Sequence, residues 1–422
     1  MSSDIEIVPV VPFDDGVAAG KETTSAQVRR RTKDVLNTEH LKDGLGSMTR
    51  ASLTAYVMSR LETEPDYVRY PELEDLYPEH LDFLRGFAKG TACSLEEAAV
   101  CDYVSYRQGL EQWYQLYQVH LEAGPCPHET HCSGVVMVGP DGVIGGQSAE
   151  SGPSQTKPKD YRFRRPKPCR GFKQKIATAE KLVLRKPRTG YIESWGVTNE
   201  MGVGCCSGNS CGTWLDDPIE DVWPIKSVPL LRFARNVEHL AELFRRYTLH
   251  NWGRGSTLWA DTGGNAMAVE KSYRRVGIRM LEDSVVWSTE GHFESPEMFR
   301  FLRAKRLEYL EKAGKHLGAG DMQYAADCHV RFTHIGELCH QPWGRGYEHI
   351  RRVFTDHSPF PRAVCRHGGP DTAPYDLSVT QASGFVDFTH NRAFRREWVP
   401  WKKFPCEVPE TVTQFPERPY LK

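Results

Sequence analysis

The stretch that begins at Cys132 constrains the fold of this chain more than any other. Behind His131, the residues Cys132–Gly134 lead into the apolar run Val135–Val138, which ends at the turn sequence Gly139–Gly142. An unbroken apolar run bounded by turn residues is typical of a buried strand, and a second strand follows to about residue 149. We therefore predict a β-hairpin in which Cys132 opens the first strand and faces a cleft. This placement makes it the candidate nucleophile.

Composition excludes several classes of function. The chain has 422 residues, and its 54 Lys and Arg balance 55 Asp and Glu, so no net field attracts nucleic acid or an anionic membrane. No apolar run reaches about 18 residues, and the N-terminus lacks the pattern of a secretory signal. The 12 cysteines are scattered, which favours a reducing compartment over a disulfide scaffold. We expect a cytoplasmic protein that binds a small molecule and needs no cofactor, nucleic acid or membrane.

The chain divides into three parts by pattern. Residues 1–45 mix Pro, Gly, Ser, Thr and charges without sustained periodicity, which suggests a mobile N-terminal arm. Residues 46–131 show apolar residues at three- and four-residue steps, and Ser94 with Glu97 has the form of a capping box, so this part should be helical. Residues 132–422 mix strand and helix patterns. We predict an α+β protein.

The later elements follow from local periodicity. Beyond the first hairpin, residues 191–206 are β-rich, and a second hairpin is expected over residues 256–270 around a Gly-Gly turn. Helices are predicted at residues 230–247, 298–314 and 346–354, with a strand near 378–388.

An unusual basic segment lies within this part. Basic and aromatic residues alternate from residue 157 to 175, inside an insertion-like stretch at 152–190. Such alternation can bind nucleic acid, but the neutral charge of the whole chain favours a solvated hairpin arm. A cationic rim for an anionic substrate lies between these two interpretations.

The chemistry of a cysteine at a strand start suggests one activity. A thiol accepts an acyl group only as the thiolate, so it needs a base nearby or a lowered pKa. If the bond before Cys132 were cut, its own α-amino group, with a pKa of about 7.7 to 8.0, would become that base. The alternative is a buried, inert thiol, which is the usual state of a free cysteine.

A series of motifs makes the chain similar to a known family. Residues 132–150 resemble the start of the mature large subunit of isopenicillin N acyltransferase-like N-terminal nucleophile hydrolases, and residues 84–97 resemble their helical prosegment. Residues 195–203 resemble the family's G-x-N-E-x-G turn, with one extra residue between Gly196 and Asn199. Further matches lie at residues 258–261, 288–296, 356–357 and 365–367, so the resemblance covers roughly residues 75–390.

The resemblance implies a fold, a processing step and an activity. The fold would be a four-layered αββα sandwich preceded by a helical prosegment. The precursor would cut itself between His131 and Cys132, and the two processed chains would stay associated. The mature enzyme would cleave or transfer the acyl group of a small amide or thioester, and we favour hydrolysis because no feature marks a coenzyme A site.

Roles transfer from the family by position. Cys132 matches the nucleophile, and Glu150 stands where the family has an Asp near the new α-amino group. Asn209 stands where related enzymes place an oxyanion-hole asparagine, and Ser256 stands where the family often has a second Asn; both side chains can donate to a developing oxyanion. Without the resemblance, Glu150 would be a surface carboxylate and Asn209 a turn residue.

Two further positions bear on the site. Arg366 resembles a late Arg of the family that helps hold the site, and Arg303 is its rival. His131 departs from the family, which commonly has Gly before the nucleophile, where a small residue lets the backbone strain for cleavage. The histidine either hinders that geometry or acts as a local base during an N-to-S acyl shift.

A different class of protein has to be weighed beside the enzyme. Cysteines and histidines crowd between residues 120 and 132, and zinc takes four such ligands in tetrahedral array. The second ligand pair is unclear, so a zinc-stabilised or unprocessed binding protein of the same fold is the alternative. The candidate ligands are His120, Cys126, His128, His131 and Cys132, with Cys205, Cys206 and Cys211, or with Cys328, His329, Cys339 and His340.

Overall fold

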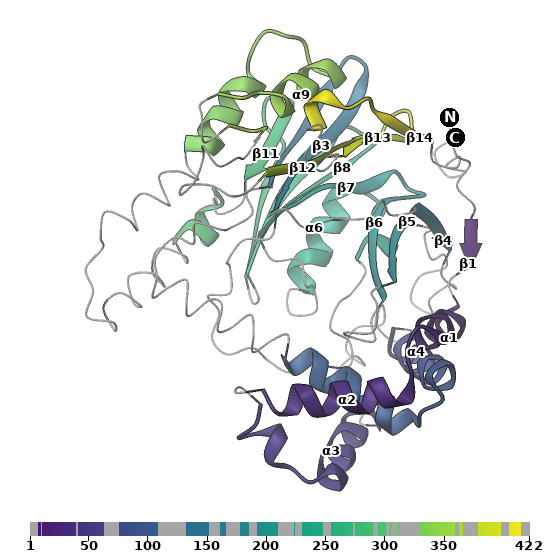
Figure 1. Ribbon diagram of the computed structural model, residues 1–422. Coiled ribbons are helices and arrows are strands. Elements are labelled where there is room, and N and C mark those ends of the chain that lie inside the picture. The colour runs from purple at the N-terminus through teal and green to yellow at the C-terminus, as the bar shows by residue number, and fades with distance from the viewer. Residues whose placement is uncertain are drawn as a thin grey trace.

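Helices and antiparallel sheets make up the structure, a computed structural model of the chain (Figure 1). It describes residues 7–9, 11–38, 41–62, 76–108, 132–151, 161–165, 178–184, 192–209, 223, 230–247, 255–272, 275–289, 294–300, 304, 311, 330–358, 363–365, 379–397 and 405–414. The predicted α+β class is confirmed.

The hairpin predicted at Cys132 lies within a six-stranded sheet. Strands β2 (Ser133–Gly139) and β3 (Gly142–Ser151) pair antiparallel across a tight turn, at which Gly142 adopts a φ of 107°. The strand order is β11-β2-β3-β12-β13-β14. The other members of this sheet are β11 (Val285–Thr289), β12 (Val379–Asp387), β13 (Arg392–Glu397) and β14 (Thr411–Gln414).

A second sheet has eight strands in the order β1-β4-β5-β6-β7-β8-β9-β10. Its neighbours pair antiparallel, except that β1 runs parallel to β4. Antiparallel pairing of β4 and β5 agrees with a hairpin in the basic segment. The strands are β1 (Ile7–Pro9), β4 (Tyr161–Arg165), β5 (Thr178–Leu184), β6 (Ile192–Asn199), β7 (Val203–Asn209), β8 (Gly255–Asp261), β9 (Ala266–Lys271) and β10 (Val276–Met280).

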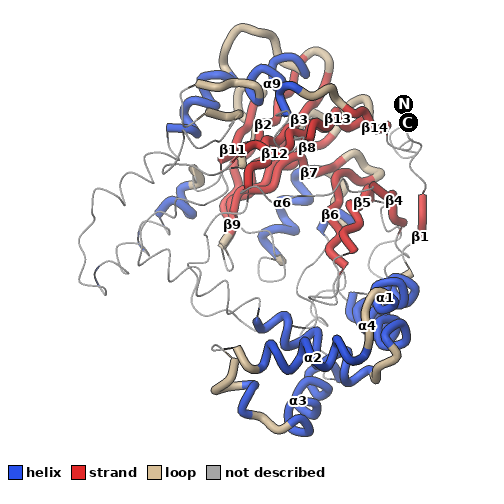
Figure 2. Tube along the Cα trace, viewed as in Figure 1, coloured by secondary structure: helices blue, strands red, loops and turns tan. Residues whose placement is uncertain are grey.

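The two sheets pack face to face through a shared apolar core. Val136 and Val286 of the six-stranded sheet contact the same buried cluster as Leu258 and Ala268 of the eight-stranded sheet. Side chains alternate along a strand, so the odd-numbered neighbours of Val136 point to the other side of their sheet. Figure 2 shows the strands of both sheets gathered in one half of the molecule.

Helices cover the outer faces of both sheets. Helix α6 (Val237–Arg246) packs on the eight-stranded sheet against Met267 and Val269, which point away from the shared core. Helix α9 (Tyr347–Phe354) and the helix at 330–339 pack on the six-stranded sheet, against Val135 and Met137. In the strands that make these contacts, one face is toward the other sheet and one is toward a helix.

The N-terminal part forms a separate helical cluster below the sheets (Figure 1). It contains α1 (Pro12–Lys21), α2 (Ser25–Leu36), α3 (Arg50–Glu62), α4 (Leu76–Thr91) and a helix at 95–108, with the 3-10 helix η1 (Leu45–Ser47). The predicted capping box is present: Ser94 Oγ accepts from the Glu97 amide at 3.2 Å, and the Ser94 amide donates to Glu97 Oε2 at 3.3 Å. The helix begins at residue 95 as expected.

Residues 12–36, which belong to the predicted mobile arm, form helices α1 and α2. Helix α1 crosses α4 at glycines: a Cβ on Gly16 or Gly86 would collide with the carbonyl oxygen of Phe83 or Phe13. Close packing of two backbones is carried by small residues, and hydrophobic periodicity does not detect it. A capping box of Thr24 and Gln27 starts α2.

The remaining predictions show one correction. The structure confirms four of them: β structure over residues 191–206, the hairpin at 256–270, the helix at 346–354 and the strand near 378–388. The single helix expected at 230–247 is wrong: it is divided into the 3-10 helix η4 (Leu230–Arg232) and α6, because Asn236 is extended and caps α6 through the His239 amide. Most of the helix expected at 298–314 lies outside the described residues.

In the part of the chain that the structure describes, every helix is too short or too polar to cross a bilayer.

Candidate functional site

Cys132 stands directly before β2, on the face that the two sheets share. Val136 belongs to the core between the sheets, and alternation places Gly134 and Cys132 on the same side. The Cys132 thiol is half-buried, whereas Cys206 on the facing sheet is buried in the shared core. Its position at the end of the sheet and its partial exposure suit a group that must meet a substrate.

One contact shows which end of the eight-stranded sheet lies nearest Cys132. The turn between β8 and β9 lies against the far end of β2, since a Cβ on Gly264 would be 3.8 Å from a methyl group of Val138. The ends of β8 and β9 that are opposite this turn therefore lie toward the start of β2. Ser256 and its cross-strand partner Glu270 are therefore at the same end as Cys132.

Ser256 has its side chain on the face of β8 that is toward the six-stranded sheet. It shares its strand face with Leu258 of the core between the sheets and is fully buried. Within the described part of the chain, its Oγ has no hydrogen-bond partner. A buried hydroxyl without a partner is costly, so such a group in a native protein suggests a ligand or a water at the site. Asn209 lies beside Ser256, because the two residues pair between β7 and β8.

A buried ion pair lies at the same end of the two sheets, and it was not predicted from the sequence. Glu270 is fully buried, and its Oε1 accepts from Arg279 Nε at 2.8 Å. Arg279 Nη2 also donates to the carbonyl oxygen of Trp287 on β11 at 2.8 Å, so the pair joins the two sheets. The amides of Glu294 and Ser295 donate to Glu270 as well, at 3.0 and 2.7 Å. A charged residue within the apolar strand Ala266–Lys271 was the only available signal.

Glu150 lies near the nucleophile in the sheet. It belongs to β3, which pairs with β2 through Ser133 and Ser148, and its backbone partner on the other side is Thr380 of β12. The chain at Glu150 is therefore at the Cys132 end of the hairpin. His131, Arg303 and Arg366 lie outside the described residues.

The asparagine of the family-like turn has a structural role. Asn199 is fully buried, and its Nδ2 donates to the carbonyl oxygens of Leu231 and Ala234 at 2.9 and 2.8 Å. Its Oδ1 accepts from the amides of Met201 and Val203, both at 3.0 Å. All the bonding capacity of the amide group is used, so Asn199 ties the β6–β7 turn to η4 and does not bind substrate.

Asp261 acts in the same structural way. Its Oδ2 accepts from the amide of Val237 at 2.9 Å, at the start of α6. Its Oδ1 accepts from the amides of Gly263 and Asn265 at 2.9 and 3.1 Å, within the β8–β9 turn. Thus two of the motifs that carry the resemblance fix turns and a helix start.

Other thiols are poor nucleophiles for a physical reason. Burial raises the pKa of the Cys101 thiol from 9.0 to about 11, and burial also raises the pKa of the Cys206 and Cys339 thiols. A thiol in apolar surroundings stays protonated and inert at neutral pH. These three cysteines are therefore structural.

The zinc ligands considered from sequence can be checked in part. Among the described residues, only His357, Cys365 and Cys406 form a group with metal-ligand spacing. The candidates in the described part are not members of it: Cys132, Cys205, Cys206, Cys339 and His340. The other candidates lie outside the described residues: His120, Cys126, His128, His131, Cys211, Cys328 and His329.

Comparison with known proteins gives weak structural similarity. No protein-family model and no curated protein matches the chain. Two variants of conjugated bile acid hydrolase from Clostridium perfringens resemble it at 12% and 14% identity over 68% of this chain and 97% and 98% of theirs, with TM-scores of 0.35 and 0.36. Penicillin V acylase from Agrobacterium tumefaciens has 13% identity over 67% of this chain and 90% of its own, with a TM-score of 0.31. The candidate site is therefore defined by the chain's own residues.

Proposed function

We propose that the chain is a cysteine N-terminal nucleophile enzyme that cleaves, or transfers the acyl group of, a small amide or thioester. One observation carries the proposal: the half-buried thiol of Cys132 stands directly before strand β2, at the end of the two packed sheets where Ser256 has a buried hydroxyl without a partner among the described residues. A nucleophile and a hydrogen-bond donor at the same end of two facing sheets suit acyl transfer.

The nucleophile becomes competent through processing. Cleavage of the peptide bond between His131 and Cys132 would give chains of residues 1–131 and 132–422, and would free the α-amino group of Cys132. The two chains would stay together, since Glu79 of α4 pairs with Arg232 of η4 at 3.1 Å and Arg60 of α3 donates to the carbonyl oxygen of Trp223. The covering helices and the two sheets would form the αββα sandwich of this enzyme class.

The reaction then has two steps. The α-amino group takes the thiol proton of Cys132, Sγ bonds to the acyl carbon, and the carbonyl oxygen becomes an oxyanion that Ser256 and Asn209 stabilise. The amine returns the proton to the leaving nitrogen, the C–N bond breaks, and a thioester remains on Sγ. Water, or an amine acceptor in the transferase reaction, attacks the thioester and releases the thiol. Glu150 would orient the α-amino group, and Arg366 would help hold the site.

Intact mass and turnover test the proposal together. Purified wild-type protein should separate on denaturation into the two chains, and it should hydrolyse members of a panel of small N-acyl amides. Cys132→Ala should stay a single chain of 48.0 kDa and show no turnover. The matched control is Cys205→Ala, which changes another half-buried cysteine and should process normally. An uncut, inactive wild-type chain would support the binding-protein alternative.

Ser256 can be tested separately from the nucleophile. Ser256→Ala should lower kcat about 10²- to 10³-fold with KM nearly unchanged, because an oxyanion donor acts in the transition state. Ser272→Ala is the control, since this serine is equally buried at the end of β9 and has no proposed role. A change in KM alone would assign Ser256 to substrate binding.

A further inference from the structure

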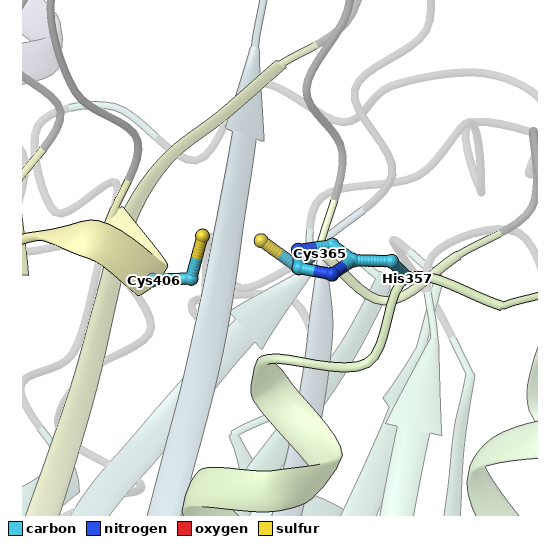
Figure 3. A group of neighbouring side chains, drawn as sticks. All are labelled: His357, Cys365 and Cys406. Carbon is cyan, nitrogen blue, oxygen red and sulfur yellow. The ribbon is translucent and has the colours of Figure 1, made fainter.

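Three potential metal ligands that are far apart in the sequence lie close together near the outer face of the six-stranded sheet. His357 follows α9, Cys365 lies in the segment 363–365, and Cys406 belongs to the 3-10 helix η6 (Pro405–Glu407) that precedes β14. One ring nitrogen of the histidine and the two Sγ atoms all lie within 4.8 Å of one another. Figure 3 shows the two thiols pointing toward each other, with the imidazole ring beside Cys365.

The backbone holds two of these ligands in place. The Cys365 amide donates to the Asp356 carbonyl oxygen at 2.9 Å, so the residue after Asp356 lies next to Cys365. The Asp356 carboxylate accepts from His334 Nε2 and from the Ser358 amide, at 2.9 and 3.0 Å, which fixes the chain on both sides of His357.

The neighbour of Cys365 is anchored to the sheet. The carbonyl oxygen of Val364 accepts from Ser148 Oγ at 3.2 Å and from Arg331 Nη2 at 3.3 Å. Val364 is fully buried, and Cys365 is only 2% exposed. Hydrogen bonds thus hold the backbone around both of these ligands, which lowers the entropy that metal binding would cost.

The chemistry and spacing of the three groups favour one ion. Thiolate and imidazole ligands select zinc among the common divalent cations, while magnesium and calcium prefer oxygen. In a tetrahedral zinc site, bonds of about 2.0 to 2.3 Å place neighbouring ligand atoms about 3.5 Å apart. The observed group needs to contract by only about 1 Å to meet this geometry. Because His357 is exposed and Cys406 half-buried, an ion and a water ligand can reach the group.

We propose that His357, Cys365 and Cys406 form a zinc site with two thiolates, one imidazole and an exchangeable fourth ligand. On binding, Zn²⁺ displaces the two thiol protons into solvent, and no redox step is involved. The ion joins η6 to the segment that Ser148 anchors on β3. Since β14 is short and forms the edge of its sheet, the site fastens the C-terminal strand to the body of the protein. This role is independent of acyl chemistry at Cys132.

Metal titration of the reduced full chain tests the proposal. Metal-free protein should take up one Zn²⁺ that the variants lose, and Co²⁺ in its place should give the absorption of thiolate-to-cobalt charge transfer. Cys365→Ser and Cys406→Ser should each weaken zinc binding by at least about 100-fold. Mutation of residues that only hydrogen-bond to metal ligands already lowers metal affinity by about 10- to 100-fold. The double variant should lose the charge-transfer band. His357→Gln should weaken binding but keep a two-thiolate spectrum.

Matched variants separate this site from other thiols. Cys93→Ser changes a half-buried free cysteine of the helical part, and it should leave zinc affinity unchanged. Cys132→Ala should bind zinc as the wild type does, whether or not the proposed enzyme activity exists. Zinc affinity retained in the double variant, or no zinc bound by the reduced wild type, would overturn the proposal.

A measurement on the wild type covers variants that fail to fold. In the native protein, zinc should protect Cys365 and Cys406 from alkylation, as read by peptide mass, and a chelator should remove the protection. A disulfide between the two residues in the freshly isolated protein, with no zinc uptake after reduction, would assign the pair to redox chemistry and overturn the zinc site.

Discussion

Glu270 and Arg279 form an ion pair between the two sheets, with Oε1 and Nε 2.8 Å apart and the glutamate side chain fully buried. The arginine reaches past the pair to the carbonyl oxygen of Trp287 on the other sheet. The position of this pair next to Ser256, at the Cys132 end of the sandwich, links the stability of the site to a charge that cannot reach water.

Breaking this pair from one side should therefore be costly. Glu270→Ala leaves the Arg279 charge without its partner and removes the acceptor of two backbone amides, so unfolding free energy should fall by about 3 to 5 kcal/mol in urea denaturation. Glu348→Ala breaks the exposed pair with Arg351 and should cost less than about 1 kcal/mol. Equal losses in the two variants would contradict the buried character of the Glu270 pair.

Asn199 should be a stability residue. Asn199→Ala leaves the carbonyl oxygens of Leu231 and Ala234 and two amides without their partner, and should lower the unfolding free energy by more than about 2 kcal/mol. Asn236→Ala, which removes one exposed N-cap bond, should cost about 1 kcal/mol. If folded Asn199→Ala instead lost only turnover, Asn199 would belong to the catalytic site.

The crossing of α1 and α4 depends on glycine. Gly86→Ala would bring a Cβ onto the Phe13 carbonyl oxygen, and the clash should lower stability by about 1 to 3 kcal/mol, although alanine is the better helix former. Gly44→Ala is the control, since its nearest neighbour would be 4.0 Å from the new Cβ. Thermal unfolding followed by circular dichroism measures both. Stabilisation by Gly86→Ala would show that α1 does not pack there.

Burial of Cys101 predicts a dependence of stability on alkaline pH. Its pKa is raised from 9.0 to about 11, so between these values the native state binds more protons than the unfolded state. The contribution of this thiol to the unfolding free energy is then fully present below pH 9. It is lost as pH rises toward 11, by about 3 kcal/mol for a shift of this size. Cys101→Ala should flatten the curve of unfolding free energy against pH over this range. An unchanged slope would contradict the raised pKa.

Local patterns in the sequence were sufficient to predict many individual helices, strands and turns. The apolar run after Cys132, the Gly-Gly turn before Asn265 and the capping box at Ser94 act over a few residues, and each formed as predicted. Packing of α1 on α4 was missed, because glycines at a helix crossing leave no hydrophobic period. The break before α6 was missed because the cap at Asn236 outweighed the apolar spacing.

By itself, then, the sequence determined many of the strands and helices and placed Cys132 at the start of the β2–β3 hairpin, directly before β2. Only the tertiary structure decided that Ser256 and the Glu270–Arg279 pair lie at the Cys132 end, and that His357, Cys365 and Cys406 meet. The reason is physical: turn and strand preferences depend on neighbours in the chain, whereas the facing of two sheets depends on core packing between residues more than a hundred positions apart.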